Sequence, residues 1–366
     1  MDFDFSEVLA HMVSVKASDV HLTPGFAPAI REKGQIQPMD GYPVLSSQHT
    51  REVVYGILND DQRKRFETEK QLDFAYAIPG VARFRVNCFF QRGAVSAAFR
   101  LVPQDIPPLD SLGVPPVLRE LASKPRGFVL VTGPTGSGKS TTLAAMIDMI
   151  NQERRDHILT IEDPIEFLHH HKSSIVNQRE VGSDAVDFAL GLRAALREDP
   201  DVILVGEMRD LETISTALTA AETGHLVFAT LHTQSTAQTV DRIIDVFPPQ
   251  QQGQVRTQLS IALQGIVTQQ LLPTADGMGR VVATEVLVPT PAIRNLIREG
   301  KTHQIYAAVQ TSGAVGMQTM DADLARLVRN GKITRSLAEQ RASVPEELKR
   351  LLGGVPVAPP QYTQVS

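Results

Sequence analysis

A glycine-rich stretch, GPTGSGKST, occupies Gly133–Thr141 and matches the pattern G-x-x-x-x-G-K-[ST] of phosphate-binding loops. An apolar run at Gly127–Thr132 precedes it and a helix-forming run at Lys139–Asn151 follows it, which is the context that the motif requires. In such loops the lysine, here Lys139, reaches the β- and γ-phosphates, and the next hydroxyl, here Ser140, coordinates magnesium. The stretch therefore predicts a site for ATP and Mg²⁺ that consists of Gly133, Pro134, Thr135, Gly136, Ser137, Gly138, Lys139, Ser140 and Thr141.

Acidic residues follow two other apolar runs and are candidates for the hydrolytic step. Glu162, Asp163 and Glu166 come at and after the run HILTIE, and Glu207 follows the run DVILVG. One acid is needed on the magnesium side and another to orient the attacking water, and strand ends next to a phosphate loop are where both should emerge. Four acids cannot all be catalytic, and Asp163 before Pro164 also suits a turn. The candidate metal ligands are Ser140, Glu162, Asp163 and Glu207.

Histidines flank one predicted strand and also form a short run elsewhere. His225 and His232 bracket the run LVFATL, and their spacing places them on opposite faces of a strand, which argues against a shared metal ion. One core and one surface histidine is the simpler interpretation. His169–His171 are adjacent, so they cannot all face one ion, and a solvated loop is expected there.

Three arginines lie on two predicted N-terminal strands. Arg83 and Arg85 fall on one face of Ala82–Phe90, and Arg100 lies in Ala94–Val102. An ordinary polar face of a sheet would explain them. Phosphoryl transfer, however, benefits from an arginine that another domain or subunit supplies, so all three are candidate catalytic residues.

The composition sets limits on the class of protein. The chain has 366 residues, enough for two domains, and its 42% hydrophobic content is that of a globular protein. A net charge of −5 gives no basic field for a nucleic acid, and no apolar run reaches the roughly 18 residues of a membrane span. Cys88 is the single cysteine, which excludes an intrachain disulfide and a multi-cysteine structural zinc site. A cytoplasmic protein is expected.

Alternating strand-like and helix-like runs predict an α/β chain. The expected strands of the second domain are Gly127–Thr132, His157–Glu162, Asp201–Gly206 and His225–His232, with helices at Lys139–Asn151, Ser183–Arg197 and Asp210–Thr223. In the first domain, helices are expected at Phe5–Ser14 and around His49–Glu69. In the second domain, the run Val255–Leu272 is amphipathic at helical spacing. The predicted divisions are an N-terminal domain at 1–103, a proline-rich linker at 104–117, an ATPase core at 118–288, a helical region at 289–352 and a disordered tail at 353–366.

Together these motifs resemble the secretion ATPase superfamily of type II secretion and type IV pili. ILTIEDPIEFLH, ALREDPDVILVGEMRD and TAAETGHLVFATLHT look like its Asp box, Walker B and His box. The resemblance implies a PAS-like N-terminal domain, a RecA-like ATPase domain and a homohexamer. It makes Glu166 and Glu207 the essential acids, with Glu166 favoured as water activator and Glu207 on the magnesium side, although the order could be reversed. It also makes the His box a γ-phosphate sensor and the N-terminal arginines contributors to a nucleotide site.

A capped, amphipathic helix near the C-terminus narrows the resemblance. Thr290 suits the N-cap, Pro291 the first turn and Gly300 the stop, with Ile293 on an apolar face and Arg294 and Arg298 on a basic one. Its sequence AIRNLIRE resembles the signature of type IV pilus retraction ATPases, the twitching motility proteins.

The resemblance to the retraction ATPases also implies partners. They are an inner-membrane pilus platform protein and a paralogous retraction ATPase. The resemblance also implies a location at the cytoplasmic face of the membrane, at the pilus base. Two alternatives remain: an extension or secretion ATPase of the same superfamily, which the missing cysteines disfavour, and a nucleotide-regulated scaffold that does not hydrolyse ATP.

Overall fold

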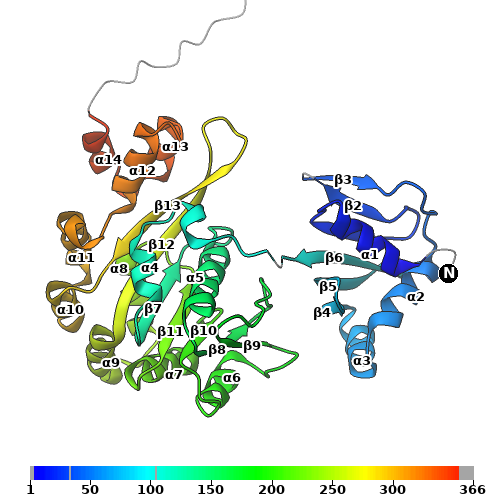
Figure 1. Cartoon of the computed structure of the whole chain (residues 1–366), viewed down its shortest axis with the longest axis horizontal. Coiled ribbons are helices and arrows are strands. Elements are labelled where there is room, and N and C mark those ends of the chain that lie inside the picture. Colours follow the sequence, from blue (N-terminus) through cyan, green and yellow to red (C-terminus); the bar gives the residue numbers. More distant parts are fainter. Residues whose placement is uncertain (1–3, 33, 104, 354–366) are drawn as a thin grey trace, which may run out of the picture. The chain divides into compact units, whose positions relative to one another are not determined.

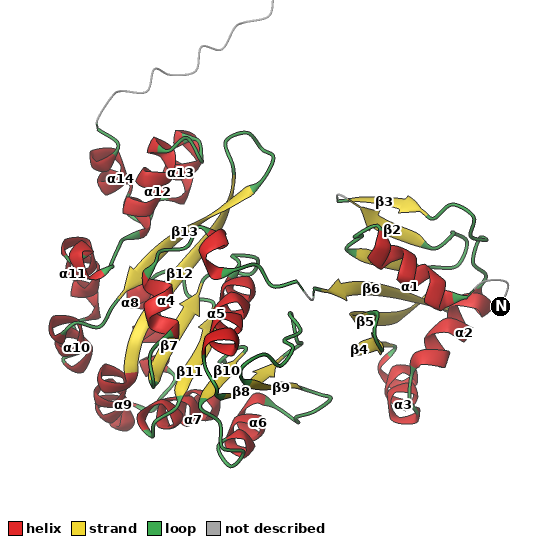
Figure 2. Cartoon of the chain, in the orientation of Figure 1, coloured by secondary structure: helices red, strands yellow, loops and turns green. Residues whose placement is uncertain are grey.

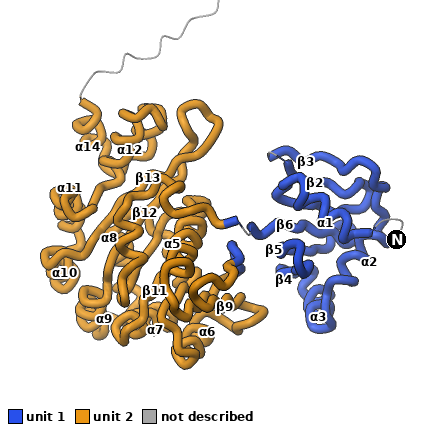
Figure 3. The backbone as a smooth tube through the Cα atoms, viewed as in Figure 1, with its two compact units in different colours: residues 1–105, 164–168 blue, residues 106–163, 169–366 orange. Residues whose placement is uncertain are grey.

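The computed structural model describes residues 4–32, 34–103 and 105–353. The chain divides into two compact units (Figure 3), one formed by Met1–Asp105 with Pro164–Leu168 and the other by Ile106–Asp163 with His169–Ser366. Within the predicted linker, Leu109 and Val117 are buried in the core of the second unit, so the segment from Ile106 onward belongs to that unit. The predicted proline-rich tail lies, from residue 354, outside the described residues.

In its described residues, the first unit has a six-stranded antiparallel sheet with strand order β3-β2-β1-β6-β5-β4 and three helices (Figure 1). Residues Phe84 and Val86 of β5 are buried in the core of this unit, while Arg85 between them is exposed, as the alternating pattern predicts. The elements are α1 (Phe5–Ser14), β1 (Asp19–Leu22), β2 (Ala29–Glu32), β3 (Gln35–Pro38), α2 (Ser47–Ile57), α3 (Asp60–Glu69), β4 (Gln71–Ile78), β5 (Ala82–Gln91) and β6 (Ala94–Val102).

The single helix expected around His49–Glu69 is wrong, because the structure has two helices there. Leu58 is extended (ψ 135°), and Asn59 begins α3 as its N-cap. The Asn59 side chain accepts from the Gln62 N–H at 2.9 Å, and the Gln62 side chain accepts from the Asn59 N–H at 3.0 Å. This reciprocal capping box starts a new helix inside an otherwise helix-forming stretch.

The second unit is built on a seven-stranded sheet with strand order β13-β12-β7-β11-β10-β8-β9 (Figure 2). All adjacent pairs are parallel except β12 and β13. Phe128 and Leu130 of β7 pack with α6 to α9 on one face, and Val129 and Val131 pack with α4 and α5 on the other. The elements are α4 (Val117–Ala122), β7 (Gly127–Thr132), α5 (Lys139–Glu153), β8 (His157–Glu162), β9 (Ile175–Glu180), α6 (Phe188–Ala195), β10 (Val202–Val205), α7 (Leu211–Glu222), β11 (Leu226–Leu231), α8 (Thr236–Asp245), α9 (Pro249–Ala262), β12 (Leu263–Pro273) and β13 (Arg280–Leu287). The predicted α/β fold class is confirmed.

The amphipathic run Val255–Leu272 is not one helix. It divides at Leu263 into the end of α9 and the strand β12. Ile266 and Val267, adjacent in sequence, are both fully buried, because β12 lies between β7 and β13 and is covered on both faces. Burial on both faces removes the alternation that would have marked a strand in the sequence.

The C-terminal region is helical, as expected. It consists of α10 (Pro291–Arg298), α11 (Ile305–Thr311), α12 (Met320–Arg329), α13 (Arg335–Arg341) and α14 (Pro345–Leu351). No helix in the described part of the chain is long and apolar enough to cross a membrane.

Helix α10 carries the AIRNLIRE sequence, and its capping is as predicted. The Thr290 side chain accepts from the Ile293 N–H, and Gly300 ends the helix with φ 68°. Ile293 and Ile297 are fully buried against the core. Arg294, however, is not on the exposed face with Arg298. It is partly buried and donates to the carbonyls of Ser260 and Ile261 at the end of α9, where a cation suits the helix C-terminus.

Candidate active site

The predicted phosphate loop connects β7 to α5 and is shaped by glycine. Gly133 has φ 139°, and a Cβ there would lie 2.3 Å from the Gln269 carbonyl oxygen of β12. Only glycine permits both this conformation and this approach. The Ser137 hydroxyl is buried and has no hydrogen-bond partner within the described ranges, so it is available to a phosphate oxygen. The loop has the form of an anion site at a helix N-terminus.

Lys139 begins α5 and is 8% exposed. Its Nζ donates to the carbonyl oxygens of Gly133 at 2.7 Å and Pro134 at 3.1 Å. Burial lowers the pKa of Lys139, and the nearby carboxylate of Glu207 opposes that shift. The ammonium group therefore lies inside the loop, and Glu207 is close enough to raise the pKa of Lys139 by its charge.

Glu207 follows β10 and is held by two basic side chains. Its Oε2 accepts from Arg209 at 2.6 Å, and its Oε1 lies 3.0 Å from His232 Nε2. The hydrogen bond from Arg209 lowers the pKa of Glu207, His232 adds to the effect, and burial opposes it. Glu207 is therefore an anionic carboxylate beside the phosphate loop.

Gly206 sets the position of Glu207 at the end of β10. A Cβ on Gly206 would lie 3.2 Å from both the Ile161 carbonyl oxygen and the Glu162 Cα of β8. The Thr230 hydroxyl donates to the Gly206 carbonyl at 2.5 Å. The backbone before Glu207 is thus fixed by strands on both sides.

The two histidines of the His box lie at opposite ends of β11. His232 is at the carboxyl end, next to Glu207. His225 precedes the strand, and its Nδ1 lies 2.9 Å from the Ala220 carbonyl at the end of α7. The strand between them spans roughly 20 Å at about 3.3 Å per residue. Within its own unit, His225 therefore lies at the opposite end of β11 from Glu207, and its catalytic role stays a prediction.

The remaining predicted acids are in different environments. Glu162 ends β8, is buried, and accepts from Thr160 Oγ1 at 2.6 Å and Gln178 Nε2 at 3.1 Å. Asp163 is exposed, and Glu166 is exposed in Pro164–Leu168, the segment that groups with the first unit. Within residues 4–32, 34–103 and 105–353, no group of three or more His, Cys, Asp or Glu side chains is arranged to hold a metal ion.

The residues next to the loop nevertheless fit magnesium that arrives with a nucleotide. Ser140 is exposed at the start of α5, and Glu207 is held in its ionised form. Hydroxyl and carboxylate oxygens, completed by phosphate oxygens and water, are the donors that Mg²⁺ prefers in such sites.

The three candidate arginines lie together in the first unit. Arg85 on β5 is directly opposite Arg100 on β6 in the antiparallel register, and Arg83 lies two residues before Arg85. Like charges directly opposite each other on neighbouring strands repel, so the Arg85–Arg100 pair does not stabilise the sheet. Arg100 Nε donates to Asp19 Oδ1 at 2.8 Å, while Arg85 is exposed. Asp19 thus neutralises one member of the pair.

Several residues of the site were not predicted from the sequence. They are Arg209, which pairs with Glu207; Asp19, which pairs with Arg100; and Gln178, which bonds Glu162. Arg209 follows Glu207 by two residues and could have been found by that spacing. The pairing of Asp19 with Arg100 depends on the register of β1 and β6, which no local pattern gives.

His169 differs from the solvated loop residue that was expected. His170 and His171 are exposed, but His169 is mostly buried, and burial lowers its pKa to about 4. Asp148 opposes this shift, whereas Lys172 and His170 favour it. His169 is therefore neutral at pH 7.

Acid should destabilise the second unit through His169. Its pKa in the folded state is below the unfolded value of 6.5, so its contribution is complete above pH 6.5 and is lost as the pH falls toward 4. The full loss is about 3 kcal/mol in the free energy of unfolding. Urea unfolding at pH 7.5 and 5 should show a smaller pH dependence for His169→Gln than for wild type, while His170→Gln serves as the exposed control. Equal pH dependence in all three proteins would contradict the assignment.

The family model for "Type II/IV secretion system protein" matches residues 82–341. The chain belongs to this family. Its phosphate loop and its membership make it a P-loop ATPase, and the resemblance inferred from the motifs is confirmed.

Members of this family resemble the chain over nearly its full length. The "Type IV pilus retractation ATPase PilT" of Pseudomonas aeruginosa is 53% identical over 94% of this chain and 99% of its own length. A "Twitching motility protein" of Neisseria gonorrhoeae is 52% identical over 88% of this chain and 86% of its own. Among solved structures, the pilus retraction motor PilT with bound ADP has a TM-score of 0.89 and 51% identity, covering 95% of this chain and 99% of that one.

Proposed function

We propose that this chain is a motor that hydrolyses Mg–ATP and uses the energy to retract type IV pili. The observation that carries the proposal is the 53% identity to a pilus retraction ATPase over 99% of that protein's length. The capped helix α10 supports it, because its AIRNLIRE sequence resembles the signature of the pilus retraction ATPases. The phosphate loop supplies the site for ATP hydrolysis.

At the phosphate loop, each residue has a proposed task. The backbone of Gly133–Thr141 binds the phosphates, Lys139 neutralises their charge, and Ser140 with Glu207 holds magnesium, directly or through water. Magnesium, when bound, supplies positive charge to the β- and γ-phosphates. His232, through its contact with Glu207, links that carboxylate to the state of the γ-phosphate. Glu166 orients the attacking water.

A ring of subunits would complete the site. We assign Arg85, with Arg83 and Arg100, to the nucleotide site of a neighbouring subunit in a homohexamer, where an arginine neutralises charge on the transferring phosphoryl group. The exposure of Arg85 and its position opposite Arg100 support this, since both leave a guanidinium group available to an anion. Motion of the first unit during the ATP cycle would then insert and withdraw this charge.

The proposed partners follow from the same function. The hexamer acts at the cytoplasmic face of the membrane on an inner-membrane pilus platform protein, together with a paralogous retraction ATPase. We assign the contact that transmits force to the exposed face of α10, where Arg298 is exposed and Arg294 is occupied by the end of α9.

Arg298→Ala should separate hydrolysis from retraction. We expect ATP turnover within about twofold of wild type, because Arg298 lies on the surface and its side chain bonds Asn295 at 3.2 Å on its own helix. Pilus retraction, measured in cells that depend on this chain, should fall severely. Lys139→Ala should abolish both activities, and Arg280→Ala, another exposed arginine of the second unit, should change neither. Normal retraction by Arg298→Ala would show that the basic face of α10 only packs.

A further inference from the structure

One glutamine joins both ends of the segment that carries Glu166. Pro164–Leu168 groups with the first unit, and the chain on either side of it, Glu162 and Asp163 at the end of β8 and His169 after it, belongs to the second unit. Gln178 on β9 donates from Nε2 to Glu162 Oε1 at 3.1 Å and accepts at Oε1 from the His169 N–H at 2.8 Å. A single side-chain amide therefore uses its donor on one end of the segment and its acceptor on the other.

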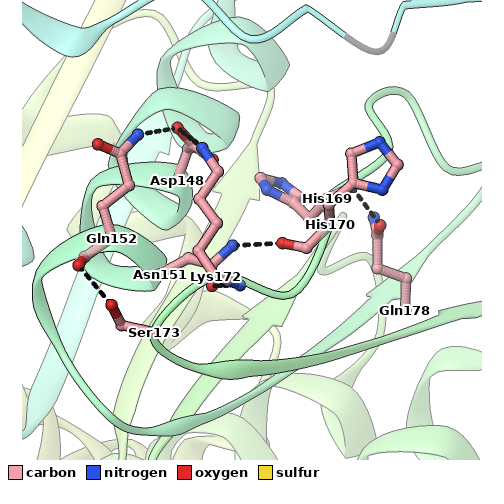
Figure 4. Close-up of polar contacts among 8 residues, drawn as sticks. All are labelled: Asp148, Asn151, Gln152, His169, His170, Lys172, Ser173 and Gln178. Carbon is pink, nitrogen blue, oxygen red and sulfur yellow. Dashed lines mark hydrogen bonds and ion pairs between the residues drawn. The ribbon is translucent and has the colours of Figure 1, made fainter.

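The turn after His169 is fixed on the helix that follows the phosphate loop (Figure 4). Asn151 on α5 is fully buried; its Nδ2 donates to the His170 carbonyl at 2.7 Å and its Oδ1 accepts from the Lys172 N–H at 3.1 Å. Its carbonyl oxygen accepts from the Ser173 N–H at 2.8 Å. Asp148, one turn earlier on α5, pairs with Lys172 Nζ at 2.6 Å.

These contacts give the Glu166 segment a rigid base. Glu162 is placed by the pairing of β8 with β10 and β9, and His169 by Gln178 and the Asn151 contacts. Because α5 starts at Lys139, the base is held to the same helix that forms the phosphate site. Fixing both ends of a loop limits the positions that its central side chain samples.

We propose that Gln178 is a positioning residue for ATP hydrolysis, which holds the two ends of the Glu166 segment at the separation that the reaction requires. The inference rests on the proposed role of Glu166 in orienting water. Gln178 does not touch the nucleotide in this role; it acts through the geometry of the segment. A displacement of about 1 Å in such a group can lower turnover by about 100-fold.

The test replaces Gln178 while keeping its size. Gln178→Met in the full chain retains the length of the side chain and removes both hydrogen bonds. We expect kcat for ATP to fall at least tenfold, while KM for ATP and the affinity for ADP stay within twofold. Asn177→Ala is the matched control, because Asn177 neighbours Gln178 on β9 but contacts His157 at 3.1 Å, and its kcat should not change.

A double-mutant cycle distinguishes positioning from a general structural effect. In a Glu166→Ala background, Gln178→Met should cause no further loss of kcat, because the group that it positions is absent. If Gln178→Met unfolds the chain, Gln178→Asn provides the same test, because the shorter side chain keeps an amide but cannot reach both ends.

Three outcomes would overturn the inference, and they differ in meaning. A kcat within twofold of wild type in Gln178→Met, with Glu166→Ala impaired, would reject positioning but leave the role of Glu166 intact. Multiplying losses in the double variant would show that Gln178 acts elsewhere. A normal kcat in Glu166→Ala would reject the proposed role of Glu166 and the inference with it.

Discussion

Glu207→Gln should lower ATP turnover by about 100-fold or more, with nucleotide binding largely retained. The substitution keeps the shape of the side chain and removes its charge. Arg209 and His232 lose the anion at 2.6 and 3.0 Å that they now hold, and the proposed magnesium ligand becomes neutral. Because the substitution keeps the size of the side chain, we expect the backbone at Gly206 and the phosphate loop to keep their positions. The loss should therefore appear in kcat and not in the affinity for nucleotide.

The measurement is steady-state hydrolysis together with the equilibrium affinity for ADP. Glu212→Gln is the matched control, since Glu212 is an exposed acid in the first turn of α7 that pairs with Arg193, and it should turn over ATP normally. A kcat for Glu207→Gln within threefold of wild type would exclude Glu207 from the hydrolytic step. Glu162 and Asp163 would then be the remaining candidates for the acid on the magnesium side.

Arg85→Ala should lower turnover by about 1,000-fold while the affinity for nucleotide remains within a few fold. Its guanidinium group is exposed and lies opposite Arg100, whose own charge is partly neutralised by Asp19 at 2.8 Å. Arg100→Ala should therefore have the smaller effect of the two. Arg65→Ala on α3, an exposed arginine paired with Glu69 at 3.2 Å, is the control.

Mixing two inactive variants tests whether Arg85 acts across a subunit boundary. In a mixed ring, a phosphate loop from Arg85→Ala can meet an intact arginine from Lys139→Ala, so part of the turnover should return. No recovery in a ring shown to contain both variants would place the arginine in the same chain as the site that it serves. Equal loss of binding and turnover in Arg85→Ala would argue that Arg85 only stabilises the first unit.

Local patterns were sufficient where the physical cause is local. The glycines, lysine and hydroxyls of Gly133–Thr141 identify a phosphate loop because the backbone shape and the chemistry are in the same stretch. The caps of α10 were found for the same reason: Thr290 and Gly300 act within one turn of the helix. The prediction of one helix around His49–Glu69 missed such a local signal. Asn59 is the N-cap of α3, but the residues on both sides of it are helix-forming, so the start of a second helix was not recognised.

The sequence by itself determined the α/β class, the nucleotide chemistry and the family. It could not determine β12, because strand pairing with β7 outweighed a helical pattern, nor which histidine lies beside Glu207, because that depends on the direction of β11 in the sheet. The contacts of Gln178, Asn151 and Asp19 were also decided only by the tertiary structure. Each bonds residues that are distant in sequence, and the free energy of such contacts depends on a register that only the packed sheet sets.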